Sequence, residues 1–387
     1  MANVLDYIEW RGDLTMEASP FNEVDNLILS EFSYLDMSDI VGNKTEDEPV
    51  PLHEAVDKFF KDKNFEEMSL GLILPSAIFD MAKLMANAPR YKDLLLWGYV
   101  SQVDRTTEYQ FSAICVDIDP KTTFVSYRGT DDTIIGWKED FNMALNHHVP
   151  SQILATKYVE AIAKATRNKL ILGGHSKGGN LAIYAAANCN SRTNKKILKI
   201  YSNDGPGFST GFLSSPGYKS IEDRTISIVP QGSIVGLLLE HTEKHTVVAS
   251  SYKGVFQHDG FSWLVKGNQF IKCDHLDQES LLVNKAVTSW LANMDDNQKK
   301  QFGDSFFDIL FSSDASTLEE LNRDKLKFFK ALSAVDPAKK KLINDKIGQL
   351  FKEGRLVLGS AMETTLKDVK EHIFNKQKDD NTKRLRH

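Results

Sequence analysis

The turn Gly174-His175-Ser176-Lys177-Gly178 constrains the fold of this chain more than any other feature. It follows the apolar run Leu170–Leu172 and precedes residues 179–186, a small and apolar stretch that is typical of a buried helix. Glycines beside a serine at such a place let a strand and a helix approach without Cβ clashes. The pattern therefore predicts a strained strand-to-helix turn that exposes the hydroxyl of Ser176.

Short β-rich runs surround this turn between Leu94 and Ser250. Helical patterns separate several of them, over residues 134–145, 153–165 and 177–189. Strands that alternate with helices predict an α/β protein whose mostly parallel central sheet carries helices on both faces. The runs are LLLWGYV, FSAICVDI, TTFVSYRG, KLILGG, ILKIYS, RTISIV and HTVVAS.

Helical patterns also flank this core on both sides. We predict an N-terminal helical layer over residues 1–90, a core over residues 91–275 and a C-terminal helical extension over residues 276–387. Amphipathic helices usually bury one face, so we expect both flanks to pack on the sheet, with a lid or a partner surface as the alternative role.

Charge and composition exclude several classes of function. The formal net charge of −6 offers no basic surface for nucleic acid. Cys115, Cys189 and Cys273 lack paired spacing and predict reduced thiols. His241 and His245 could face one side of a helix as metal ligands, but no third ligand is evident, so we predict neither a metal nor a cofactor.

The sequence also bears on the location of the chain. The N-terminal segment does not resemble a secretory signal, and no apolar stretch is long enough to cross a bilayer. We therefore predict a cytoplasmic protein without a transmembrane segment and leave peripheral membrane contact open. The sequence makes no prediction of the oligomeric state.

A serine nucleophile needs a base and donors for the developing oxyanion. The backbone N–H that follows the serine, that of Lys177, is one predicted donor. The side chain of Lys177 is expected to be solvated, with contact to an anionic substrate headgroup as the alternative. His258 is the predicted base, since it lies in a loop downstream of the serine, in VFQHDGFSW, whereas His175 is expected to be structural.

The loop Tyr127-Arg128-Gly129-Thr130, followed by Trp137 and Asp140, resembles the R-G-T loop of class 3 lipases. Those lipases also carry a late histidine followed by an aromatic residue. The opening stretch DYIEWRGDLTMEASPFNEVDNLILSEFSYLD extends the resemblance, over roughly residues 1–275, to a bacterial lipase-like family of unassigned function within the α/β-hydrolase superfamily. The resemblance implies an α/β-hydrolase fold and an oxyanion-hole N–H from Thr130, with the hydroxyl of Thr130 as a possible second donor. It also implies an Arg128–Asp140 pair that either braces the loop or is an exposed contact.

The position of the catalytic acid differs from that in the lipase pattern. The resemblance places the usual carboxylate where this chain has Ser233, and a serine cannot stabilise an imidazolium as a carboxylate does. Asp204 follows the run ILKIYS, at the carboxyl end of a predicted strand, where ligands of open α/β sheets bind. We therefore predict Asp204 as the acid, with Glu240 as the next candidate and a simple turn aspartate as the alternative explanation of Asp204.

These residues together predict a serine hydrolase acting on carboxylic esters of small molecules or lipids. His258 would deprotonate Ser176, and Asp204 would orient the imidazole. Two alternatives stay open. One is a catalytically degenerate binding or regulatory protein, motivated by Ser233 and by the helical additions at both ends of the chain. The other is an acyltransferase or thioesterase.

Overall fold

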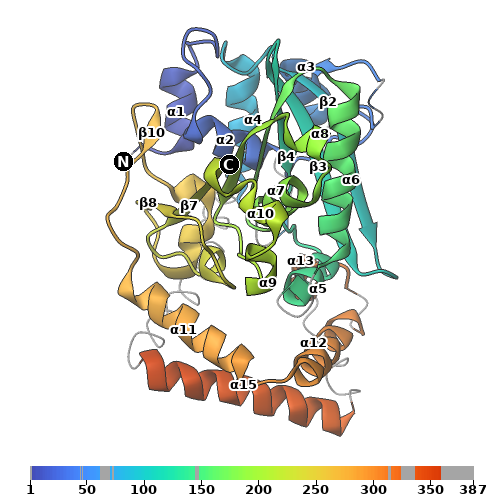
Figure 1. Cartoon of the computed structure of the whole chain (residues 1–387), viewed down its shortest axis with the longest axis vertical. Coiled ribbons are helices and arrows are strands. Elements are labelled where there is room, and N and C mark those ends of the chain that lie inside the picture. Colours follow the sequence, from blue (N-terminus) through green and yellow to red (C-terminus); the bar gives the residue numbers. More distant parts are fainter. Residues whose placement is uncertain are drawn as a thin grey trace, which may run out of the picture.

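One sheet organises the part of the chain that the structure describes. The structure is a computed structural model, and it describes residues 2–43, 45, 47–61, 70–71, 74–143, 148–312, 315–323 and 336–358. Within these residues, eight strands form the central sheet of an α/β-hydrolase fold (Figure 1). The strands are β1 (Val50–Pro51), β2 (Leu95–Asp104), β3 (Tyr109–Asp119), β4 (Thr122–Tyr127), β5 (Lys169–His175), β6 (Ile197–Asn203), β7 (Thr225–Pro230) and β8 (His245–Val248).

The strands lie in the sheet in the same order as in the sequence, from β1 to β8. All seven β-rich runs that the sequence analysis identified form strands, and β4 to β8 are parallel. The pairs from β1 to β4 are antiparallel instead. The connections over residues 105–108 and 120–121 are far too short for a crossover, so β2, β3 and β4 pair as hairpins.

Helices cover both faces of the sheet. The N-terminal helices are α1 (Val4–Arg11), α2 (Glu23–Phe32), α3 (Leu52–Phe60) and α4 (Ala77–Asn87). The middle of the chain forms α5 (Ile134–Met143), α6 (Pro150–Ala165), α7 (Lys177–Asn188), α8 (Ser191–Asn194), α9 (Thr210–Leu213) and α10 (Pro216–Lys219). The last part forms α11 (Gln278–Ala292), α12 (Asp296–Phe311), α13 (Leu318–Arg323) and α15 (Pro337–Leu358), and a small hairpin pairs β9 (Val265–Lys266) with β10 (Gln269–Phe270).

The order of the strands explains why the N-terminal helices are needed. Right-handed crossovers between consecutive neighbouring strands put every crossover helix on the same face of a sheet. The side chains of Val125 and Leu172 accordingly pack with α6 and α7 in one core cluster. Those of Phe124 and Ile171 point the other way, into a second cluster with α1, α2 and α4. The N-terminal helices thus cover the face that the crossover helices leave open.

A buried ion pair fixes this N-terminal layer. Arg90, which follows α4, donates from Nε to Oδ1 of Asp25 on α2 over 2.7 Å, and both side chains have no exposed surface. The hydroxyl of Tyr91 donates to the same oxygen over 2.6 Å. A paired and hydrogen-bonded charge is tolerated inside a protein, so the contact holds α2 and the end of α4 in one arrangement.

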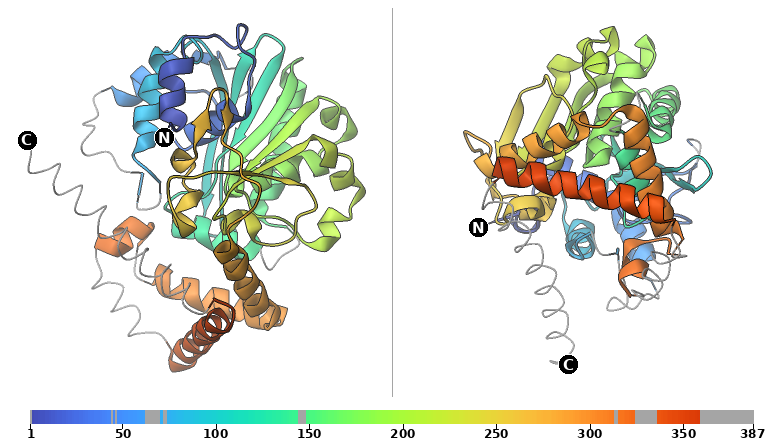
Figure 2. Two further views of the ribbon diagram at one scale, coloured as in Figure 1. Left: turned by 90° about the vertical axis from the view of Figure 1, so that its left-hand side faces the viewer. Right: turned by 90° about the horizontal axis from the view of Figure 1, so that it is seen from below.

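Helices α11, α12 and α15 lie below the body in Figure 1, on the side where α5 and α9 lie (Figures 1 and 2). Trp290 of α11, Phe302 of α12 and Ile343 of α15 share a small core of their own. Phe141 of α5 contacts Phe302, with ring centroids 5.9 Å apart, and this contact joins α12 to the body. The predicted boundaries at residues 90 and 275 stay predictions, and residues 359–387 of the predicted extension lie outside the described residues.

Membrane insertion has no support among the helices of the structure. Among the residues described, no helix combines the length and the apolar character that a membrane span requires.

Candidate active site

Ser176 occupies the strained turn that the sequence predicts. It follows β5 directly and precedes α7, with φ 57° and ψ −130°. A residue other than glycine in such a conformation costs on the order of 1–3 kcal/mol and persists only when its surroundings fix it. Here the Ser176 N–H donates to the carbonyl oxygen of Asn203 over 2.9 Å, and the Gly179 N–H donates to the carbonyl oxygen of Ser176 over 3.0 Å.

The glycines beside the serine are required by close backbone packing. A Cβ atom on Gly178 would overlap the carbonyl oxygen of Tyr127, and one on Gly174 would overlap the backbone of Gly178. The first turn of α7 therefore lies directly against the ends of β4 and β5. Any side chain at these positions would push the turn apart, which explains the small residues around Ser176.

Asp204 and His258 meet next to this turn. The two atoms in contact are Nδ1 of His258 and Oδ2 of Asp204, 2.6 Å apart. Asp204 follows β6, the strand beside β5, and His175 is paired with Asn203 in the register, so Ser176 and Asp204 leave the same sheet edge. Asp204 is fully buried, whereas the side chain of His258 is 25% exposed. The contact joins a buried carboxylate to an imidazole that solvent reaches.

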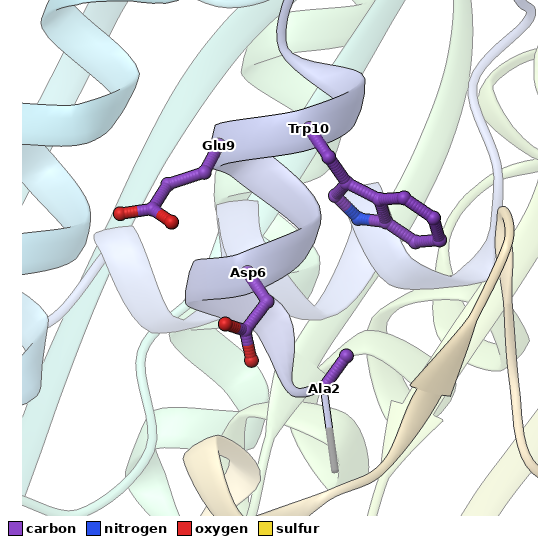
Figure 3. A pocket seen from close by; sticks show the side chains of 4 residues that line it. All are labelled: Ala2, Asp6, Glu9 and Trp10. Carbon is purple, nitrogen blue, oxygen red and sulfur yellow. The ribbon is translucent and has the colours of Figure 1, made fainter.

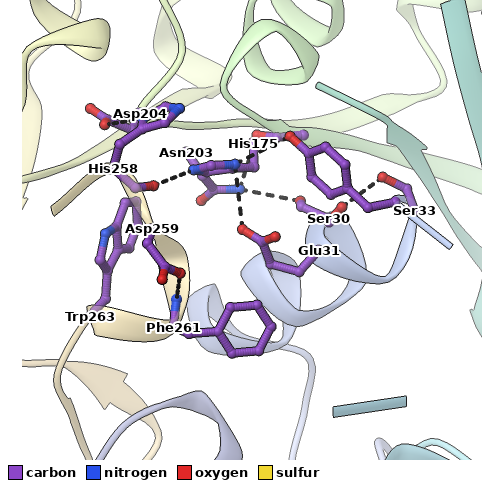
Figure 4. Close-up of polar contacts among 12 residues, drawn as sticks. Ser30, Glu31, Ser33, His175, Asn203, Asp204, His258, Asp259, Phe261 and Trp263 are labelled. Carbon is purple, nitrogen blue, oxygen red and sulfur yellow. Dashed lines mark hydrogen bonds and ion pairs between the residues drawn. The ribbon is translucent and has the colours of Figure 1, made fainter. Parts of the chain in front are cut away.

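Ser233 holds the other oxygen of this carboxylate. Its hydroxyl donates to Oδ1 of Asp204 over 2.5 Å, and the N–H of Gly236 donates to the same oxygen over 3.2 Å. Asp204 itself has a positive φ of 50°, and its N–H donates to the carbonyl oxygen of Ile228. Oδ1 is thus engaged by the segment that follows β7, which leaves Oδ2 directed at His258 (Figure 4).

His258 ends a short 3-10 helix, Gly254–His258, and packs against the residue before the serine. The ring centroids of His258 and His175 are 4.6 Å apart, and the carbonyl oxygen of His258 accepts a hydrogen bond from Nε2 of His175 over 2.8 Å. The predicted base therefore packs against the residue that precedes the predicted nucleophile, although the two segments are far apart in the sequence. Glu240, the second candidate for the acid, is exposed and pairs through its backbone with Phe208.

The loop that carries Thr130 also lies against the turn. A Cβ atom on Gly129 would be 3.2 Å from Cβ of Ser176, which shows how closely the loop passes. The hydroxyl of Thr130 donates to Oδ2 of Asp140 over 2.6 Å. Burial raises the pKa of Asp140 to about 6, although the charge of Lys177 opposes the shift. The predicted Arg128–Asp140 pair is wrong, because Arg128 pairs with Asp131 at 3.0 Å.

The expectation that the side chain of Lys177 is solvated is also wrong. This side chain is 1% exposed, and its Nζ lies 3.1 Å from Oε2 of Glu139 on α5. It also donates to the carbonyl oxygen of Gln110 over 3.0 Å and to the side-chain oxygen of the same residue over 2.9 Å. The buried side chain of Lys177 therefore connects α7 to α5 and β3. It is not placed to bind an anionic substrate headgroup.

Replacement of Lys177 by methionine is expected to lower the free energy of unfolding by about 3–5 kcal/mol, because the buried Glu139 would lose its partner. Urea unfolding followed by circular dichroism measures the loss. The double variant Lys177→Met, Glu139→Gln is expected to recover part of it. Lys339→Ala is the control, since its pair with Asp308 is exposed and such pairs contribute less than about 1 kcal/mol. An equally small loss for Lys177→Met would contradict a stabilising buried pair.

Two other groups of polar side chains do not form a metal site or a second catalytic site. His241 precedes β8 and His245 begins it, so the two do not share a helical face, and in the described part of the chain no three metal-ligating side chains come together. A surface pocket beside α1 contains an indole ring and two carboxylates but no candidate nucleophile (Figure 3). Its lining residues are Ala2, Asp6, Glu9 and Trp10.

The family model described as Mbeg1-like matches residues 85–308 of the chain. The chain belongs to the Mbeg1-like family. The expected resemblance to a lipase-like family of the α/β-hydrolase superfamily is confirmed. No curated protein sequence matches this Mbeg1-like chain.

Two solved structures are similar to this Mbeg1-like chain. The Rhizomucor miehei lipase propeptide complex is 15% identical, with a TM-score of 0.30, over 41% of this chain and 57% of that chain. The M37 lipase is 16% identical, with a TM-score of 0.35, over 56% of this chain and 70% of that chain. This chain thus spans less than two thirds of the length of the first of them.

Sequence reasoning missed two residues of this Mbeg1-like site. It treated Ser233 only as a serine in the usual place of the acid, whereas the hydroxyl of Ser233 is a hydrogen-bond donor to Asp204, the predicted acid. It also passed over Glu31, whose carboxylate lies 3.4 Å from Nδ1 of His175. A signal for Glu31 exists in the sequence, since an isolated acidic residue interrupts the largely apolar stretch Leu27–Leu35. A charged residue in such a stretch often has a buried partner.

Proposed function

We propose that this Mbeg1-like chain is a serine hydrolase that cleaves carboxylic esters. The observation that carries the proposal is the 2.6 Å contact between Nδ1 of His258 and Oδ2 of Asp204, beside the turn that bears Ser176. A nucleophile on a strained turn, an imidazole and a buried carboxylate at one sheet edge form the set that acyl transfer uses.

In the proposed mechanism, Oγ of Ser176 attacks the carbonyl carbon of the ester. Nε2 of His258 takes the proton of the serine hydroxyl and gives it to the leaving alkoxide, and a covalent acyl-serine remains. Water then attacks the acyl group with the same imidazole as base, which releases the acid and restores Ser176. Asp204 accepts the Nδ1–H of His258, so that Nε2 is free to act, and it stabilises the imidazolium that forms.

Two backbone N–H groups, those of Lys177 and Thr130, would donate to the oxyanion. Burial of the Lys177 side chain supports the first, because its contact with Glu139 fixes the start of α7. The hydroxyl of Thr130 already donates to Asp140 and has a single proton, so it cannot also donate to the oxyanion. The main-chain N–H is therefore the proposed donor at Thr130.

The proposal for a catalytically degenerate protein rested on a serine in the usual place of the acid. The hydrogen bond from Ser233 to Asp204 offers another explanation for that serine. An acyltransferase or a thioesterase would use the same residues with another acceptor or another leaving group, so the substrate decides between them.

The experiment is a hydrolysis assay of the purified full-length chain on p-nitrophenyl esters from acetate to palmitate, with thioesters and phospholipids beside them. We expect saturable ester hydrolysis with a preferred acyl length. Faster turnover of thioesters than of the matched oxygen esters would favour a thioesterase. Absence of turnover on all of them would contradict a hydrolase.

A further inference from the structure

His175 and Glu31 form a buried contact beside the site that the proposed acyl transfer does not use. Nδ1 of His175 lies 3.4 Å from Oε1 of Glu31 on α2, and their side chains are 8% and 3% exposed. The hydroxyl of Tyr34 lies 3.4 Å from the same nitrogen. Oε1 of Glu31 is buried and has no hydrogen-bond partner among the described residues. Its polar neighbour is Nδ1 of His175 (Figure 4).

Burial disfavours the charged form of both groups in this contact. Burial raises the pKa of Glu31 well above its ordinary value, and the negative charge of Asp259 adds to the effect. Burial and the neighbouring His258 together lower the pKa of His175 to about 3, although the charge of Asp204 opposes the shift. Near neutral pH, burial therefore favours the form of His175 with a single proton, and it favours the protonated form of Glu31 over the carboxylate.

The hydrogen bonds determine where the single proton of His175 lies. The carbonyl oxygen of His258, 2.8 Å from Nε2, can only accept, so Nε2 must carry the hydrogen. Nδ1 is then an acceptor, and the hydroxyl of Tyr34 and the carboxyl group of Glu31 lie next to it, each at 3.4 Å. His175 thus connects Glu31, through this 3.4 Å contact, to the main chain of His258.

We propose that His175, itself oriented by Glu31, is a positioning residue that fixes His258 by donating from Nε2 to the main-chain carbonyl oxygen of His258. The inference deepens the proposed function and rests on the role of His258 as the base. It gives α2, an element of the N-terminal layer, a part in the geometry of the site. His175 does not touch the reacting atoms.

The loop around His258 explains why one hydrogen bond matters there. The preceding carbonyl oxygen, that of Gln257, accepts from Nε1 of Trp263 over 2.8 Å. Two consecutive carbonyl groups are thus held by two buried rings, and the ring of His258 lies between Asp204 and His175. Without the hydrogen bond from His175, the contact with Asp204 would have to orient His258 by itself. A base that moves by about 1 Å can cost on the order of 100-fold in rate.

The first test compares two variants of His175. Gln reaches about as far as Nε2 and keeps an N–H donor, whereas Phe keeps a planar ring and removes the donor. We expect His175→Phe to lower kcat by about 10- to 100-fold with KM nearly unchanged, and His175→Gln to stay within about fivefold of the wild type. An equal loss in both variants, or no loss in His175→Phe, would overturn the proposal.

A second pair of variants covers the case in which His175→Phe does not fold. Glu31→Gln keeps a donor for Nδ1 of His175, and Glu31→Met keeps the length of the side chain without one. We expect Glu31→Gln to retain most of kcat and Glu31→Met to lose about tenfold, because an oriented buried hydrogen bond is removed. Similar activity in both would show that the donor is not needed.

A measurement without a substrate separates this inference from the proposed function. Imidazole ¹⁵N spectra of the wild type are expected to show His175 as the neutral Nε2–H form between about pH 5 and pH 8, where an ordinary histidine titrates. The ring signals of His258 should change in Glu31→Met and not in Glu31→Gln. If this pattern appears without any ester turnover, the proposed function fails and the positioning holds. A titrating His175, or unchanged His258 signals in Glu31→Met, overturns the positioning.

Discussion

Replacement of Ser176 by alanine is expected to lower kcat for ester hydrolysis by about 10⁴-fold or more, because the acyl-enzyme can no longer form. Stopped assays on the preferred p-nitrophenyl ester measure the loss. KM should change little, since the methyl group of alanine leaves the surrounding site in place. The free energy of unfolding should not fall, because backbone hydrogen bonds with Asn203 and Gly179 hold the turn.

The matched control is Ser214→Ala, on the exposed end of α9, where the hydroxyl donates to the carbonyl oxygen of Thr210. It should leave kcat within about twofold of the wild type, as expected for a surface substitution away from the site. Residual activity of Ser176→Ala within tenfold of the control would contradict the assignment of the nucleophile.

Replacement of Asp204 by asparagine is expected to lower kcat by on the order of 10³- to 10⁴-fold, because an amide neither stabilises the imidazolium nor selects the right tautomer of His258. Ser233→Ala removes a single donor to the same carboxylate, so its loss should be smaller, about tenfold. Steady-state kinetics on one ester compare the two variants.

Glu240→Gln is the matched control for this prediction, since Glu240 was the other candidate for the acid. We expect Glu240→Gln to keep kcat within about twofold of the wild type, because Glu240 is exposed and Asp204 is the residue that contacts His258. A severe loss in Glu240→Gln together with a mild one in Asp204→Asn would transfer the role of the acid to Glu240.

The strands of the core could be predicted from local patterns, and their pairing only in part. Apolar runs such as KLILGG and ILKIYS carry their own β signal, and both form strands. The antiparallel pairing of β2, β3 and β4 depends on connections whose shortness becomes clear only when the strand ends are known. The strand β1 has two residues, and it exists through its pairing with Leu95 and Leu96 rather than through its own sequence.

The candidate site shows the same division between local and distant effects. The strained turn at Ser176 could be read from its neighbours, because the reason for the glycines is local. The side chain of Lys177 could not, since Gln110 and Glu139, which bury it, come from β3 and α5. The same holds for Ser233, which lies 29 residues from Asp204 in the sequence. Tertiary contacts decide the partner of a buried polar group, and the residue type alone does not.

The central claim is that Ser176 is a nucleophile activated by His258 and Asp204. Its most direct test is reaction of the full-length protein with a fluorophosphonate, followed by mass spectrometry of the intact chain and of its peptides. The account predicts one adduct per chain on the peptide that contains Ser176, no adduct in Ser176→Ala, and much slower labelling in Asp204→Asn. A folded wild-type protein that stays unlabelled, or an adduct that persists in Ser176→Ala, would contradict it.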